Sequence, residues 1–68
     1  MEISKRKINI ILARKQMTTI ELAKNYGVSR ARILAILKSE ELTPVCVGRL
    51  AKALDVDVTE ILEDEEVV

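Results

Sequence analysis

Aromatic side chains are almost absent from this sequence of 68 residues, which contains one tyrosine and neither tryptophan nor phenylalanine. Proteins that bind single-stranded nucleic acid stack its bases on aromatic rings, so this composition argues against that class. Histidine is also missing, and one cysteine can form neither an internal disulfide nor a usual zinc site. We therefore expect no metal, no cofactor and no disulfide framework.

Sequence features of enzymes and of membrane proteins are missing as well. Without histidine, a glycine-rich phosphate loop or a nucleophile beside a base, the sequence fills none of the roles of an active site. It also lacks an apolar run of about eighteen residues and a signal-peptide pattern, so neither membrane insertion nor secretion is indicated. We expect a cytoplasmic protein that is not an enzyme.

Apolar residues make up 49% of the chain, which is enough for the core of one small domain. The charges divide sharply: residues 1–38 hold nine basic and two acidic side chains, residues 39–68 hold two basic and nine acidic ones, and the halves carry +7 and −7. A cationic face favours DNA through counterion release. Solvent-exposed helix surfaces of opposite net charge would give the same division of charge without any binding partner.

A short helix is predicted to begin at Thr19, because Thr18 and Glu21 have the spacing of a capping box. Its inward positions are Leu22, Ala23 and Tyr26. Gly27 follows where a chain leaving a helix often needs a positive φ, which glycine adopts at little cost. The helix should therefore end near Tyr26.

A second helix is predicted from about Arg30 to Lys38, with Ser29 as its N-cap. Its inward stripe consists of Ile33, Ile36 and Leu37. At roughly 100° per residue, the outward face consists of Ala31, Leu34, Ala35 and Lys38. Arg30 and Arg32 flank this face. Two short helices joined by a tight turn form a helix-turn-helix, which offers its second helix to the major groove of DNA.

Three more helices complete an all-α prediction. The first runs from about Ser4 to Lys15, and Ile3 and Ile10 form a strip that could pack on the last helix or on a second subunit. The next has Thr43 as N-cap and Pro44 in its first turn. It is expected to bury Val47, Leu50, Ala51 and Leu54, and to use Gly48 for a close helix approach.

The last helix is expected from about Thr59 and should pack Val58, Ile61 and Leu62. The helix-turn-helix domain then comprises residues 1–62, and residues 63–68 form an acidic, frayed tail.

The order and spacing of these features resemble the phage repressor and Cro family of helix-turn-helix regulators over about residues 7–62. The matching stretches are Met17-Thr18-Thr19, Leu22-Ala23, Gly27-Val28-Ser29-Arg30, Ile33, Ile36, Thr43-Pro44, residues 50–54, Val56 and residues 58–62. The resemblance implies a compact bundle of about five helices that binds operator DNA, usually as a symmetric dimer.

Two departures from that family are informative. Leu12 and Leu37 occupy positions where the family commonly pairs an arginine with a glutamate. Apolar residues of similar volume often replace a buried ion pair without loss of stability, so these two leucines are expected to contact each other. Ser39-Glu40-Glu41 stands where many relatives carry glycine and basic residues, which weakens the expected phosphate contact there.

The candidate base contacts are Arg30, Ala31, Leu34 and Ala35, and the candidate phosphate contacts are Thr18, Thr19, Arg32, Lys38 and Ser39. Arg30 is the better candidate for guanine because its guanidinium can pair with two acceptors. Several of these residues have plainer roles: the arginines as solvated charges, the alanines as clearance, the threonines as caps, and Leu34 as part of a protein interface. Cys46 is interpreted as a small apolar residue rather than a redox switch.

These features predict a sequence-specific regulator of transcription that binds a double-stranded DNA operator as a homodimer. We expect a repressor rather than an activator, because the chain leaves no room for a separate effector domain. The alternative is a protein-interaction module on the same fold, such as an antitoxin or the partner of an anti-repressor.

Overall fold

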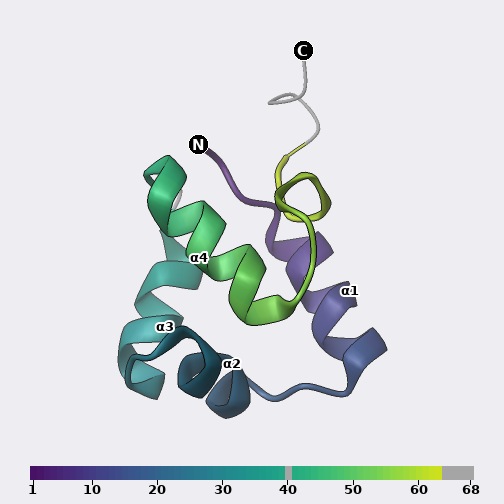
Figure 1. Ribbon diagram of the computed structural model, residues 1–68, viewed down its shortest axis with the longest axis vertical. Helices are drawn as coiled ribbons and strands as arrows, with labels where there is room; N and C mark the ends of the chain where they lie inside the picture. Colours follow the sequence, from purple (N-terminus) through teal and green to yellow (C-terminus); the bar gives the residue numbers. More distant parts are fainter. Residues whose placement is uncertain (40, 64–68) are drawn as a thin grey trace.

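The computed structural model describes residues 1–39 and 41–63, and over these ranges the chain is a bundle of four α-helices (Figure 1). The helices are α1 (Lys5–Lys15), α2 (Thr19–Tyr26), α3 (Arg30–Lys38) and α4 (Pro44–Leu54), followed by η1 (Val58–Glu60), a single 3-10 turn. Figure 1 shows α4 between α1 on one side and the α2–α3 pair on the other. The expected all-α helix-turn-helix class is confirmed.

Each of the four helices begins where a side-chain oxygen accepts an otherwise unpaired backbone N–H of the first turn. The four N-caps are Ser4, Thr18, Ser29 and Thr43, and each accepts the N–H three residues further on, at 3.1 to 3.2 Å. The starts predicted for the first four helices are therefore confirmed.

The core is formed by one face of each helix, and α4 contributes the largest share. Its buried residues are Val47, Leu50, Ala51, Ala53 and Leu54, and the other buried apolar residues are Ile3, Ile8, Ile11, Leu22, Ala23, Ile33, Ile36, Ile61 and Leu62. Residues of α2, α3 and α4 are fully covered where these helices meet, so the position of α3 is fixed by apolar packing on one face. The opposite face is left for solvent or a partner.

The fifth helix of the prediction is wrong, because the chain forms only the short turn η1 there and then pairs with the N-terminus. Ser4 donates its N–H to the Ile61 carbonyl at 2.7 Å, Glu63 donates to the Glu2 carbonyl at 3.1 Å, and Ile3 and Leu62 form an antiparallel bridge. A longer helix would use these backbone groups internally. Residues 61–63 therefore pair with residues 2–4 instead of continuing a helix.

Two smaller expectations are also corrected. Ile3 lies outside α1 and is 5% exposed in this bridge, whereas Ile10 is 46% exposed, so the two residues do not form one strip. Gly48 does not mark a close helix approach, because a Cβ atom built there would meet no atom within 4 Å.

Candidate nucleic-acid interface

The turn between α2 and α3 fixes the angle of the candidate recognition helix. Gly27 ends α2 with φ 94°, a left-handed conformation that glycine adopts without a side-chain penalty. Its N–H and that of Val28 both donate to the Ala23 carbonyl, at 2.8 and 3.0 Å. Leu22 and Ile33 are fully buried on either side of this turn. The two helices therefore form one unit, as the sequence predicted.

The N-terminus of α2 is closed by its own capping box. The Thr18 N–H and hydroxyl both donate to Glu21 Oε1, at 3.0 and 3.2 Å, and the hydroxyl oxygen accepts the Glu21 N–H at 3.1 Å. The Thr18 side chain is thus occupied within the protein. The backbone N–H groups of Thr19 and Ile20, in the first turn of α2, have no intrahelical acceptor and can donate to a phosphate.

The exposed face of α3 combines two cations with two small side chains. Arg30, Ala31, Ala35 and Lys38 are all exposed. Leu34, by contrast, is half-buried and packs against the core, so its side chain is only partly available on this face. Small residues between long cations let a helix approach base edges closely, which suits major-groove binding.

The C-terminal end of α3 is held by a hydrogen bond inside the following loop. Ser39 is half-buried, and its hydroxyl donates to the Glu41 carbonyl at 3.1 Å, so it shapes the path to α4. The neighbouring Glu41 side chain is 78% exposed and places a negative charge there. Lys38 is therefore the better candidate for a phosphate contact at this end.

Charge pairing separates α1 from α3. In α1, the Lys7 Nζ donates to the Leu62 carbonyl at 2.9 Å, and Arg14 Nη1 lies 3.8 Å from Glu60 Oε1. Lys15 Nζ donates to the Asp55 carbonyl at 2.9 Å and lies 3.8 Å from Asp55 Oδ2. In α3, Arg30, Arg32 and Lys38 have no ion pair within the described ranges. All three cations of α3 are thus available to an external anion.

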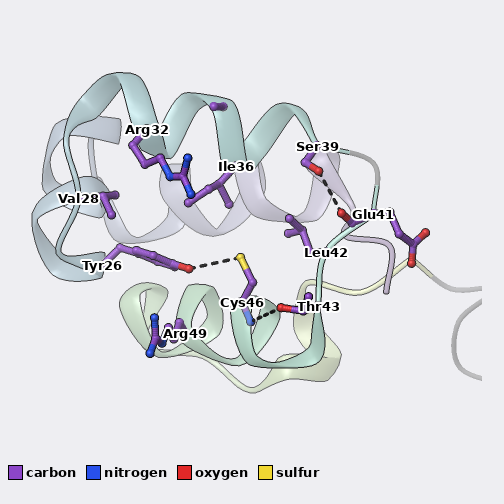
Figure 2. Close-up of a pocket in the computed structure, with 11 residues that line it drawn as sticks. Tyr26, Val28, Arg32, Ile36, Ser39, Glu41, Leu42, Thr43, Cys46 and Arg49 are labelled. Carbon is purple, nitrogen blue, oxygen red and sulfur yellow. Dashed lines mark hydrogen bonds between the residues drawn. The ribbon is translucent and has the colours of Figure 1, made fainter.

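One flank of α3, which includes Arg32 and Ala35, faces α4 across an open groove (Figure 2). Tyr26 points into this groove, and its hydroxyl lies 3.3 Å from Cys46 Sγ. This hydrogen bond, together with burial, raises the pKa of the Tyr26 phenol, while the positive charges of Arg49 and Arg32 oppose the rise. Sequence reasoning did not find this cluster, since Arg49 comes near α3 only when α4 docks.

No group of three or more potential metal ligands occurs among residues 1–39 and 41–63. In the same ranges, none of the helices has the length and apolar content that crossing a membrane requires.

Comparison with protein-family models gives a match to the Cro/C1-type HTH DNA-binding domain over residues 7–66. The match includes all of α2, α3 and α4, and most of α1. No curated protein and no solved structure matches the chain.

Proposed function

This chain belongs to the family of Cro/C1-type helix-turn-helix DNA-binding domains, and from that premise we propose that it is a sequence-specific transcriptional regulator, acting as a repressor. In this proposal α3 enters the major groove of an operator, and the N-terminus of α2 and the C-terminal end of α3 contact the phosphates on either side.

The observation that carries the proposal is the availability of the α3 cations. Arg30, Arg32 and Lys38 are exposed and have no acidic partner in the described ranges, while the buried face of the same helix is locked by Ile33 and Ile36. A helix that is packed on the core through one face and has unpaired cations on its outer side suits a polyanion, because neutralising phosphates releases condensed counterions.

The residues of this surface divide into two roles. We assign base contacts to Arg30, Ala31, Leu34 and Ala35, with Arg30 bidentate to guanine and the apolar side chains against thymine methyl groups. We assign phosphate contacts to Arg32 and Lys38 through their charges, and to Thr18, Thr19 and Ser39 at the ends of α2 and α3. Leu34 and Ser39 are the weakest members, because both are half-buried.

A homodimer is the assembly that we propose on DNA. The described residues of one copy extend 32 Å along their longest axis. Half-sites recognised by two-fold symmetric dimers lie about 34 Å apart, one turn of DNA. One copy presents a single recognition helix, so a second copy is needed to read the next half-site on the same face of the duplex.

Selection of bound duplexes from a random pool tests the proposal directly. We expect enrichment of a palindrome and a binding constant that falls steeply with salt, by about 0.9 logarithmic units per phosphate contact for each tenfold rise in salt. The Arg32→Ala variant should lower that slope by about 1 per protomer. If no duplex is enriched although the protein is folded, the DNA-binding function is wrong and the protein-interaction alternative is favoured.

A further inference from the structure

The groove between α3 and α4 has the size and lining of a small-molecule site. Its volume is about 460 Å³, within the range of about 300–1,000 Å³ that ligand pockets occupy. Its apolar wall is formed by the half-buried Val28, Leu42 and Cys46 and by the buried Ile36 (Figure 2). Ala35 also lines the groove, so this surface overlaps the edge of the face assigned to bases.

Two guanidinium groups border the same groove, Arg32 from α3 and Arg49 from α4, and the carboxylate of Glu41 lies at its other end (Figure 2). Both arginines are exposed, and neither has an ion pair in the described part of the chain. Both charges also act on the Tyr26 phenol, which points into the groove. Figure 2 shows Arg32 and Arg49 on either side of the Tyr26 side chain, so both cations border the same end of the groove.

We propose that this groove binds a small amphipathic organic anion. Its apolar body would lie on Val28, Ile36 and Leu42, and its anionic head would pair with Arg32 and Arg49. A phosphodiester backbone matches this lining less well, because it carries charge but offers no apolar body to the groove wall. The second arginine and the apolar wall together select an anion with a hydrocarbon part.

Binding there is coupled to DNA through Arg32, a step that rests on the proposed function. Arg32 is assigned to a phosphate, and a bound anion neutralises the same guanidinium, so the ligand lowers affinity for the operator. By linkage, the operator lowers affinity for the ligand by the same factor. The groove is thus the site at which an inducing metabolite of this chemical class releases the regulator.

Octanoate is the probe for the groove, tested on the DNA-free protein by chemical shifts of backbone amides. We expect saturable shifts confined to residues lining the groove, with octanol and acetate each binding at least tenfold more weakly because one lacks the charge and the other the apolar body. Arg49→Gln should weaken octanoate about tenfold. Lys52→Gln is the matched control, since Lys52 is also an exposed cation of α4 but does not border this groove.

Equal octanoate affinity for Arg49→Gln and the parent, equal affinity for octanol and octanoate, or shifts that map elsewhere would each overturn the site. The coupling is tested separately, by titrating the selected duplex with and without octanoate. Octanoate that binds in the groove and leaves duplex affinity unchanged would overturn the coupling alone. Octanoate binding by a protein that enriches no duplex would instead refute the proposed function and the coupling, and leave the site intact.

Discussion

Two helices of this protein, α1 and α3, both begin at a serine N-cap and both carry several cations, but they use these cations differently. Lys7, Arg14 and Lys15 of α1 bind carbonyl or carboxylate oxygens of the C-terminal part of the chain. The cations of α3 have no such partners within the described residues. Lys5 and Arg6 at the start of α1 are exposed and have no ion pair in the described residues either, so the difference between the helices lies in the other three cations of α1.

This difference explains why a chain with a formal net charge of zero can present a cationic surface. Part of the positive charge of α1 is neutralised internally by the acidic half, as at Arg14–Glu60 and Lys15–Asp55. The acidic groups used in these pairs lie at the far end of α4 and in η1, away from α3 along the chain. None of the positive charge of α3 is neutralised by an ion pair in the described residues, and α3 is the helix with the exposed small side chains.

The largest effect on stability is expected from substitutions where α1 and α3 are predicted to contact each other. Leu12 of α1 and Leu37 of α3 are both half-buried and pack against the core, and truncating either to alanine should cost about 2 kcal/mol of unfolding free energy, the lower end for core leucines. Leu12→Arg alone should cost more, because it buries an unpaired charge. Chemical denaturation measures each loss.

The paired change Leu12→Arg with Leu37→Glu is the decisive variant of this set. If the two side chains touch, the new ion pair should recover part of the loss caused by Leu12→Arg. Strictly additive losses would show that Leu12 and Leu37 are not neighbours, and that α1 and α3 are held apart by other residues.

The next effect concerns DNA binding, which substitutions in α3 should weaken and the matched substitution in α1 should not. Arg30→Ala should cost about 1–3 kcal/mol on the selected duplex and relax preference at one base pair, because a bidentate contact to guanine is lost. Arg32→Ala should weaken all sequences more evenly. Arg14→Ala is the matched control in α1 and should leave duplex affinity within about twofold, because its guanidinium already pairs with Glu60. Titrations with selected and scrambled duplexes measure both affinity and preference.

If Arg14→Ala weakened the duplex as much as Arg30→Ala, the distinction between paired and available cations would be wrong. If neither Arg30→Ala nor Arg32→Ala had an effect, α3 would not be the helix in the major groove.

A smaller effect is expected on stability, for a cation of α1 that should not contribute to DNA binding. Lys15 Nζ donates to the Asp55 carbonyl at the C-terminal end of α4, so Lys15→Ala should lower the unfolding free energy by about 0.5–1 kcal/mol and leave duplex affinity unchanged. Lys24→Ala is the control, since Lys24 is an exposed cation of α2 without a partner in the described residues. It should change stability by less than about 0.5 kcal/mol. Equal thermal shifts for the two variants would contradict the assigned role of Lys15.

The features that the sequence predicted correctly are those set by a few neighbouring residues. The caps at Thr18, Ser29 and Thr43 and the positive φ of Gly27 follow from spacings of three residues and from the conformational freedom of glycine. The sequence therefore predicted where the two helices of the helix-turn-helix begin and end, and the candidate residues on α3 could be named from it.

Contacts between distant segments were not predictable in this way. The bridge between Ile3 and Leu62 replaced an expected helix, and the Tyr26–Cys46 hydrogen bond joins residues 20 positions apart. Both contacts depend on how α4 and residues near the two ends of the chain pack against the rest of the protein. A pattern of neighbouring residues does not predict such packing. For the same reason the groove beside α3 was missed, although Arg32 itself had been named as a phosphate contact.

The smallest expected effect concerns the acidic segment that follows Glu63. The predicted tail began at Glu63, and residues 64–68 lie outside the described part of the chain. Glu63 itself borders the same cleft as Lys5, Arg6 and Ser39, so the acidic segment starts near the end of α3. Its negative charges should repel DNA that comes within a Debye length, about 8 Å at physiological salt.

Deleting residues 64–68 keeps the Glu63 N–H that donates to the Glu2 carbonyl, so the fold should be retained. Non-specific duplex affinity should rise by a few-fold at low salt and by less at high salt, because screening removes the repulsion. Titration of the full-length and shortened proteins with a scrambled duplex at two salt concentrations measures this difference, and their melting curves provide the control for folding. Identical titrations at low salt would refute masking and leave the acidic residues a role in solubility or in contact with a protein partner.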